Sequence, residues 1–146
     1  MSRPSWDQYF MAMAHLASNR STCLRRQVGA VLTKDNQILG TGYNGAPKRT
    51  KHCIETGCIR EELDVPSGER HELCRAVHAE QNAIIQCAVS GSSTKHTVLY
   101  CTTYPCSICA KIIINADIIV VVYEGDYPDP AAKKLFEDAG VRVRKV

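Results

Sequence analysis

The spacing of apolar residues predicts three elements in the first part of the chain. Apolar side chains recur at helical spacing over 6–18, and Ser5 and Gln8 stand at the positions of a capping box, so we expect a helix there. Two short apolar runs follow, at 28–33 and 38–43. Because only a polar turn separates them, they are predicted to pair as a β-hairpin.

The second half of the chain alternates helical and extended patterns. The run at 118–123 is apolar without alternation, which is typical of a strand covered on both faces. The run at 141–144 alternates apolar and basic residues and predicts an edge strand. The predicted elements are a helix at 78–89, a strand at 97–101, a helix at 106–115, a strand at 118–123, a helix between Asp129 and Gly140, and a strand at 141–144.

The segment from Asn44 to about Glu72 follows neither period. Loops of this length are uncommon in compact domains unless they are functional or disordered. We interpret residues 44–74 as a Cys/His-rich loop insertion that a second zinc ion would order, because metal binding supplies free energy that a short irregular segment lacks. Free cysteines in a mobile loop are the alternative. The candidate ligands are Cys53, Cys58, His71, Cys74 and, from upstream, Cys23.

The order of these elements is helix, hairpin, long loop, and then helix and strand in alternation. In a chain of 146 residues this order predicts one α/β domain over residues 1–146, with a sheet of about five strands. Ligand sites in such domains commonly lie beside strand ends and at helix N-termini. We therefore expect the functional residues at the starts of the later helices.

Composition limits the class of protein. Apolar residues make up 45% of the chain, as expected for a folded globule, and the net charge is +3. This mild excess of basic residues is compatible with a phosphorylated substrate but too weak to indicate nucleic acid binding. No apolar run approaches the length of a membrane span, so no membrane partner is expected.

Eight cysteines are many for a chain of this size. The first residues lack the apolar core of a signal peptide, so we expect a cytoplasmic protein whose thiols stay reduced. Thiols close to histidines in such a protein indicate metal ligands rather than disulfides.

A histidine, a carboxylate and two thiols form the strongest chemical signal. His78 and Glu80 stand two positions apart, where a helix is predicted to begin. Cys106 and Cys109 stand three positions apart at the start of another helix, so both sulfurs share a face and can reach one ion. His78, Cys106 and Cys109 therefore predict a zinc site with three protein ligands, which leaves a position for water.

His-x-Glu followed by Pro-Cys-x-x-Cys is the signature of zinc-dependent base deaminases. Zinc lowers the pKa of bound water and so provides hydroxide at neutral pH. Glu80 is not needed as a ligand and is free to carry protons from that water to a ring nitrogen and to a leaving amine. The alternative is a structural zinc held by His78, Cys106, Cys109 and a further thiol.

Arg25 and Arg26 lie just before the first predicted strand. They are either solvated charges at a strand entrance or a phosphate-binding pair, because arginine binds phosphate with two parallel hydrogen bonds. The pattern by itself leaves both interpretations open.

Four segments resemble one enzyme family over nearly the whole chain. They are Val28-Gly29-Ala30-Val31, Gly42-Tyr43-Asn44-Gly45-Ala46-Pro47, His78-Ala79-Glu80-Gln81-Asn82-Ala83 and Pro105-Cys106-Ser107-Ile108-Cys109-Ala110-Lys111. Together they resemble the deoxycytidylate (dCMP) deaminase family, and Gly-Tyr-Asn-Gly is more discriminating than the zinc motif. The resemblance implies a three-layer α/β/α, cytidine-deaminase-like sandwich around a mixed sheet. It also implies zinc-dependent hydrolysis of dCMP to dUMP and ammonia, which feeds thymidylate synthesis.

The same resemblance implies roles for further residues and partners. Asn44 should contact the sugar of the substrate, Tyr127 should pack on the pyrimidine, and Arg25 or Arg26 should contact the phosphate. A second, structural zinc should use at most four of the five candidates named above. Many family members are homohexamers that dCTP activates and that dTTP with Mg²⁺ inhibits, so we expect that assembly and these effectors.

Two other functions share part of this pattern. A tRNA adenosine deaminase has the same zinc motif, but we would expect a more basic surface and no Gly-Tyr-Asn-Gly. A non-catalytic zinc module that binds a partner or nucleic acid through the cysteine-rich loop is the second alternative. Glu80 speaks against it, because a purely structural site has no use for an unliganded carboxylate at that spacing.

Overall fold

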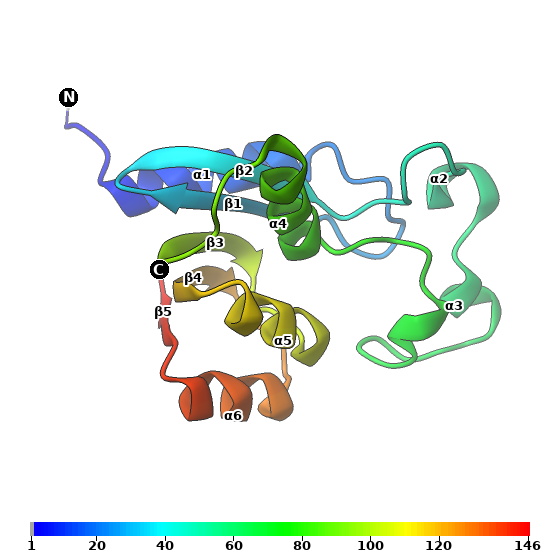
Figure 1. The fold of residues 1–146 in the computed structure, drawn as a ribbon. Coiled ribbons are helices and arrows are strands. Elements are labelled where there is room, and N and C mark those ends of the chain that lie inside the picture. The colour runs from blue at the N-terminus through cyan, green and yellow to red at the C-terminus, as the bar shows by residue number, and fades with distance from the viewer. Residues whose placement is uncertain (1) are drawn as a thin grey trace.

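The computed structural model describes residues 2–146, which form a five-stranded sheet with helices on both faces (Figure 1). Every strand overlaps the segment that predicted it. The strands are β1 (Gly29–Lys34), β2 (Gln37–Tyr43), β3 (Thr97–Thr103), β4 (Ile118–Gly125) and β5 (Arg142–Lys145). Their order across the sheet is β2-β1-β3-β4-β5.

The sheet is mixed, as the resemblance implied. β1 pairs antiparallel with both β2 and β3, whereas β4 runs parallel to β3 and to β5. Parallel neighbours need a crossover connection, and helices α5 (Ser107–Asn115) and α6 (Pro130–Ala139) supply the two crossovers. β5 is one edge of the sheet, as its alternating sequence predicted, and β2 is the other.

The helices form two layers around the sheet, which confirms the predicted three-layer sandwich. α1 (Trp6–Ser18) packs on one face against β1 and β3. α4 (Ala79–Ser90) packs on the opposite face against β2 and β1, and α5 beside it packs on α6. No helix in the described part of the chain is long and apolar enough to cross a lipid bilayer.

Two apolar cores lie on the two faces of the sheet, because side chains along a strand alternate in direction. Val31, Tyr100 and Val122 point toward α1 and pack with Phe10. The residues next to these three along each strand point to the opposite face of the sheet, toward α4 and α5. The buried residues of that larger core include Leu32, Leu99, Val121, Cys87 and Ile113. β4 is covered on both faces over most of its length, as predicted, but Ile119 is 42% exposed.

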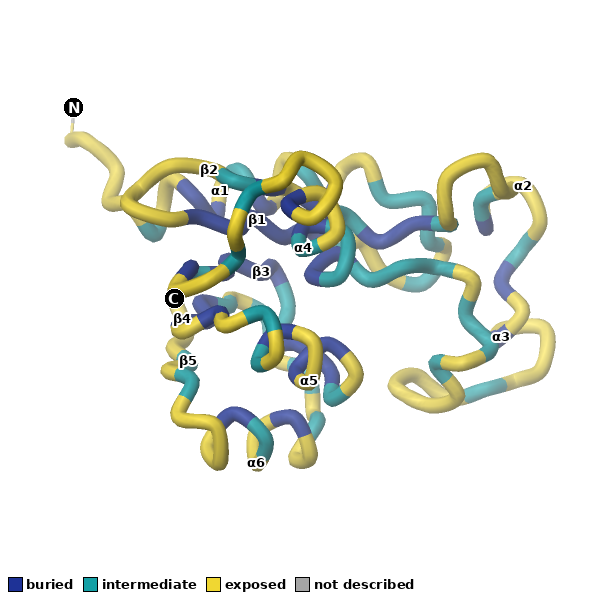
Figure 2. Tube along the Cα trace, in the orientation of Figure 1, coloured by how far each residue is buried: buried dark blue, intermediate teal, exposed yellow. Residues whose placement is uncertain are grey.

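The segment between residues 44 and 74 is the main departure from the predicted elements. It contains two one-turn helices, α2 (Cys53–Thr56) and α3 (Ile59–Glu62), and a 3₁₀ turn, η1 (His71–Leu73). Single turns are too short to show a hydrophobic period, which is why the sequence predicted none. The two helices project past the end of the sheet away from both chain termini (Figure 1). Figure 2 shows mostly exposed backbone there, interrupted by the buried residues Cys53, Cys58 and Arg60.

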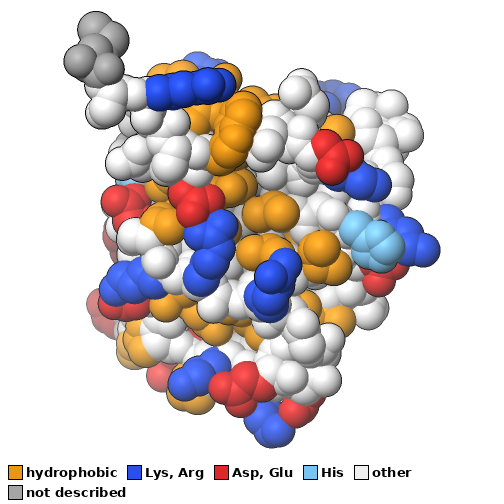
Figure 3. Space-filling model, turned by 90° about the vertical axis from the view of Figure 1, so that its left-hand side faces the viewer, with side chains coloured by type: hydrophobic (Ala, Val, Ile, Leu, Met, Phe, Trp, Pro, Cys, Tyr) orange, Lys and Arg blue, Asp and Glu red, His pale blue; other side chains and the backbone are white. Residues whose placement is uncertain are grey.

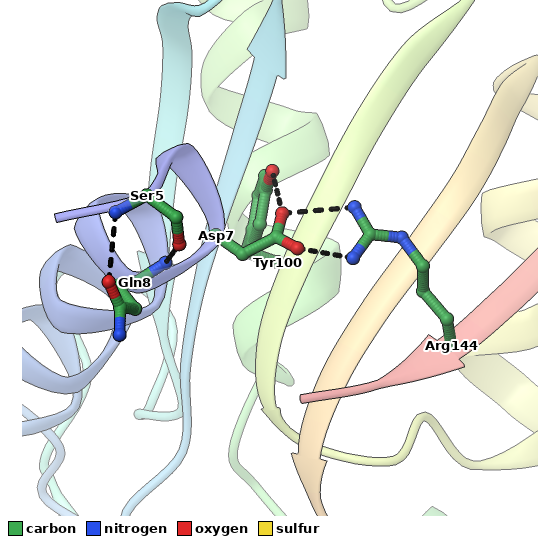
Figure 4. Close-up of polar contacts among 5 residues, drawn as sticks. All are labelled: Ser5, Asp7, Gln8, Tyr100 and Arg144. Carbon is green, nitrogen blue, oxygen red and sulfur yellow. Dashed lines mark hydrogen bonds and ion pairs between the residues drawn. The ribbon is translucent and has the colours of Figure 1, made fainter.

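A polar network ties the first helix to the last strand (Figure 4). Asp7 accepts two hydrogen bonds from the Arg144 guanidinium and one from the Tyr100 hydroxyl, the last at 2.9 Å. Ser5 and Gln8 form the predicted capping box, in which the Gln8 N–H donates to Ser5 Oγ (3.2 Å) and the Ser5 N–H donates to Gln8 Oε1 (2.8 Å). These contacts fix where α1 begins against the sheet.

Candidate active site

Three metal-ligating side chains converge just beyond the end of β3, and they are the three that the zinc motif contains. His78 Nδ1 lies 3.2 Å from Cys109 Sγ and 3.5 Å from Cys106 Sγ. Within residues 2–146, they form the one group of three or more His, Cys, Asp and Glu donors that all lie within 4.8 Å of one another. One nitrogen and two sulfur donors suit zinc, so the residues present fit a catalytic zinc with an open fourth position.

Two helix starts position these donors. His78 is the N-cap of α4, and its backbone N–H donates to Gln81 Oε1 (2.8 Å). Cys106 is the N-cap of α5. The Asp129 carboxylate accepts from the Ser107 N–H (2.7 Å), which ties the start of α5 to the start of α6. The partial positive charge at a helix N-terminus favours the thiolate form that zinc binds.

Gly42 in β2 allows α4 to approach the sheet closely. A Cβ at this position would lie 2.1 Å from the Ala79 carbonyl oxygen, in the first turn of α4. Asn82 Nδ2 donates to the Tyr43 carbonyl oxygen at 2.8 Å, which fastens the same part of the helix to the end of β2. The Gly-Tyr-Asn-Gly segment therefore helps to place the helix whose start carries the histidine ligand.

Hydrogen bonds between the ligands set the charge of the thiol pair. The hydrogen bond from Cys109 lowers the pKa of Cys106 to about 4, with help from His78 and against the effect of burial. Conversely, the hydrogen bond that the Cys109 thiol donates to Cys106 raises the pKa of Cys109, and burial raises it further. The pair therefore holds one thiolate at neutral pH, and a divalent cation would displace the remaining proton.

Glu80 lies beside the three donors without being one of them. The residue is 5% exposed, and its Oε2 lies 3.5 Å from Cys109 Sγ. Burial raises the pKa of this carboxyl, although the charge of His78 opposes the shift. A raised pKa brings a carboxyl closer to neutral pH, where it can both accept and donate a proton.

A pocket open to solvent leads to these residues, and Tyr127 lines it. The Tyr127 hydroxyl lies 3.3 Å from His71 Nε2, and the Arg26 guanidinium lies 4.7 Å from the centre of the tyrosine ring. His71 packs edge-to-face on the ring of His78, with 5.4 Å between ring centres. Gly68 permits this arrangement, since a Cβ there would lie 2.9 Å from the Tyr127 hydroxyl. The aromatic side chains thus connect the ligand histidine to the pocket wall.

Asn44 is buried in the pocket wall and holds the chain that enters β1. Its Oδ1 accepts from the Val28 N–H (2.9 Å), and its Nδ2 donates to the Arg26 carbonyl oxygen (3.0 Å). A side-chain amide has a second N–H and further acceptor capacity, so Asn44 can hold this segment and still bind a ligand.

The two arginines considered from the sequence both line the pocket. Arg25 Nη1 donates to the Val65 carbonyl oxygen (3.2 Å), and Arg26 Nη2 donates to Ser67 Oγ (3.3 Å). A third arginine, Arg60, also lines the pocket, and sequence reasoning missed it. It lies on α3, and no pattern in the insertion distinguished it from the other charged residues there.

The candidates for a second zinc fall into two groups. Burial raises the pKa of Cys53, and negative charge on the neighbouring sulfurs of Cys23, Cys74 and Cys58 raises it further. In the described chain no three of these four sulfurs lie within 4.8 Å of one another, so they are gathered less closely than the first ligand set. His71, the fifth candidate, lies at the pocket, where its Nε2 contacts the Tyr127 hydroxyl.

Residues 4–124 match the sequence profile of the cytidine and deoxycytidylate deaminase zinc-binding region. Over its full length the chain is 44% identical to ComE operon protein 2 of Bacillus subtilis and covers 74% of that protein. Over 98% of its length it is 41% identical to the deoxycytidylate deaminase of Schizosaccharomyces pombe, of which it covers 44%. The chain thus spans less than half the length of this yeast relative.

The fold also matches solved structures. The chain aligns with dCMP deaminase from the cyanophage S-TIM5 in complex with dCMP and dUMP over 100% of both chains, with a TM-score of 0.82 and 32% identity. The apo form of the phage enzyme aligns over 99% of this chain with a TM-score of 0.78. Sequence profile, relatives and fold therefore agree on one group of proteins.

Proposed function

Because the chain belongs to the cytidine and deoxycytidylate deaminase family, we propose that it catalyses the zinc-dependent hydrolysis of dCMP to dUMP and ammonia. The observation that carries this proposal is the buried Glu80 carboxylate beside the three metal donors. A structural zinc site has no need of such a carboxylate, whereas base deamination uses one as general acid and base. The relatives named as dCMP deaminases support a nucleotide as the substrate.

Zinc held by His78, Cys106 and Cys109 would lower the pKa of a water molecule and so supply the nucleophile. Glu80 accepts a proton from this water at a carboxylate oxygen and passes it to the ring nitrogen next to the reacting carbon. It then carries the second proton of the water to the exocyclic amine, which leaves as ammonia. The water oxygen remains on the ring as the new carbonyl, and Glu80 returns to its starting state.

The pocket wall offers a contact for each further part of the nucleotide. Asn44 would bind the sugar with its remaining N–H, and Tyr127 would pack on the pyrimidine. Arg25 and Arg26 would bind the phosphate. The position of Arg26 beside the Tyr127 ring supports this arrangement, since it sets a phosphate-binding group next to a surface for the base.

We propose in addition that a structural zinc orders residues 44–74. The clustering of thiols around Cys53 supports this, because four cysteines form a common structural zinc site. Binding would draw the sulfurs closer together than they lie here. The proposed ligands are Cys23, Cys53, Cys58 and Cys74, which leaves His71 to the pocket.

Regulation and assembly are proposed on the family resemblance. We expect a homohexamer that dCTP activates and that dTTP with Mg²⁺ inhibits. dCMP saturation curves with and without each nucleotide test the effectors, and light scattering tests the assembly. Hyperbolic curves that neither nucleotide changes would show an unregulated enzyme. A cytoplasmic location is expected because free cysteines persist in a reducing compartment.

The charge distribution supports a small substrate over a nucleic acid. The net charge is only +3, and Figure 3 shows acidic and basic side chains interspersed with apolar ones over one face of the molecule. A tRNA adenosine deaminase would need a basic surface along the phosphate backbone. A nucleotide needs only the few arginines that line the pocket.

A substrate panel tests the proposed function. Zinc-loaded protein is incubated with dCMP, CMP, dCTP and deoxycytidine, and ammonia release is measured. We expect dCMP to be the best substrate. Ammonia release from none of the cytosine compounds, with zinc shown to be bound, would overturn the proposal.

A further inference from the structure

Arg60 is a buried cation with almost no hydrogen-bond partners. The residue is 8% exposed and lines the pocket. A guanidinium has five N–H donors. In Arg60, Nη2 makes one long contact with the Pro66 carbonyl oxygen (3.5 Å), and the buried Nε has no partner. Within residues 2–146, no carboxylate forms an ion pair with it.

This state is unfavourable unless a ligand completes it. Burying a charge costs free energy unless an opposite charge or a full set of hydrogen bonds accompanies it. Arg60 has neither in the chain itself, and it borders the pocket rather than one of the two apolar cores. An anion that enters the pocket would supply both missing interactions.

The loop at 65–67 accepts one contact from each of three arginines. Its residues accept in chain order from Arg25 (3.2 Å), Arg60 (3.5 Å) and Arg26 (3.3 Å). Burial increases from Arg26, which is exposed, through Arg25 to Arg60. Three positive charges around one short loop repel one another, so an anion placed among them would relieve that repulsion.

Arg60 also acts on the residue expected to hold the base. Burial raises the pKa of Tyr127, whereas the charges of Arg26 and Arg60 lower it. The exposed guanidinium of Arg26 and the buried guanidinium of Arg60 are therefore both close enough to act electrostatically on the Tyr127 side chain. A nucleotide whose base packs on Tyr127 would bring its phosphate into their range.

We propose that Arg60 is the specificity-determining residue that binds the 5′-phosphate of the substrate from the buried side of the pocket wall. Its fork of N–H donors matches two phosphate oxygens, and Arg25 and Arg26 contact the same group from the more exposed side. The phosphate oxygens replace the long contacts with the 65–67 loop. This inference rests on the proposed function, since the phosphate is that of the nucleotide whose base reaches Glu80.

Arg60→Met tests this role, with Arg142→Met, at an exposed position of β5, as the matched control. The measurements are zinc content, kcat/KM for dCMP and for deoxycytidine, and the affinity for dUMP by calorimetry. We expect Arg60→Met to lower both kcat/KM for dCMP and dUMP affinity about 10- to 100-fold, because charge-assisted phosphate contacts are lost. Deoxycytidine turnover and zinc content should stay at the wild-type values, and Arg142→Met should change nothing.

Arg60→Lys is the second variant, since it keeps a buried positive charge and serves even if the methionine variant does not fold. Lysine binds phosphate as a point charge without a fork, so the loss should be smaller and still confined to dCMP. An equal loss for dCMP and deoxycytidine would show a structural role, and unchanged dCMP kinetics would show that the phosphate binds elsewhere. Either result overturns the inference. The proposed function fails separately, if the wild-type enzyme does not deaminate dCMP.

Discussion

Cys109 Sγ lies 3.5 Å from Glu80 Oε2, so the proposed metal ligand and the carboxylate proposed to carry protons are direct neighbours. The two residues come from different helices, α5 and α4, which pack against each other. The packing of these helices therefore sets both the geometry of the proposed metal site and the position of the proposed proton carrier.

Glu80→Gln should separate metal binding from catalysis. The amide has almost the same size but cannot carry a proton, so activity should fall by about 100- to 10,000-fold while zinc stays bound. Ammonia release and elemental analysis check this, with Glu137→Gln, exposed on α6, as control. Activity close to wild type would remove Glu80 from the mechanism.

The part of the site that the sequence predicts is the part that stands at helix starts. His78 and Glu80 flank the start of α4, and Cys106 and Cys109 lie one turn apart at the start of α5. At such positions residue spacing alone decides which side chains share a face. The helices and strands were predictable for a related reason, since each apolar run is long enough to show its period.

Arg60 and His71 show what the sequence could not supply. Both lie in the insertion, in elements of a single turn, so no period indicated the direction of their side chains. His71 stands three positions before Cys74, which favoured a shared zinc site. In the structure Arg70 has a left-handed backbone (φ 52°), and the Nε2 of His71 after it contacts Tyr127. Tertiary contacts, rather than local spacing, determine the roles of these residues.

Gly42→Ala should disturb the active site through the first turn of α4. The added Cβ would lie 2.1 Å from a backbone oxygen of Ala79, so the helix must move. We expect a loss of about 1–3 kcal/mol in the free energy of unfolding and weaker zinc binding. Urea unfolding and zinc competition with a chelator measure the two effects. Gly91→Ala, at the other end of α4, meets no atom within 4 Å; its left-handed backbone (φ 76°) makes alanine costly for stability there, but zinc affinity should stay unchanged. Equal zinc affinity in both variants would contradict the prediction.

Cys53→Ser should remove the proposed structural zinc and spare the catalytic one. Elemental analysis of the wild type should give about two zinc ions per chain, and the variant should give about one, because one thiolate of four is lost. Cys87→Ser is the matched control, since Cys87 is also buried but only burial acts on its pKa. A wild-type content of one zinc, unchanged in the Cys53 variant, would rule out the second site.

Asp7→Asn should lower stability at neutral pH but not in acid. The hydrogen bond from Arg144 holds the pKa of Asp7 below its ordinary value of 3.8 in the folded protein. The carboxylate therefore stabilises the fold above that value, and this contribution is lost as the pH falls through the lower, folded-state pKa. The Asp7 side chain is 28% exposed and that of Arg144 50%, so solvent screening limits the effect to about 1 kcal/mol.

Urea unfolding of wild type and Asp7→Asn from pH 7 down to pH 3 checks the sign, because protonation of other groups and loss of metal affect both proteins alike. The difference in unfolding free energy should be largest at neutral pH and shrink as the pH falls below 3.8, because Asp7 of the unfolded wild-type chain then takes up a proton before Asp7 of the folded protein does. Asp126→Asn removes the ion pair with Lys145, in which the Asp126 side chain is 74% exposed, and should have little effect at any pH. A difference for Asp7→Asn that stays constant with pH would mean that the side chain contributes through packing rather than through its charge, and the network that joins α1 to β5 would then not be electrostatic.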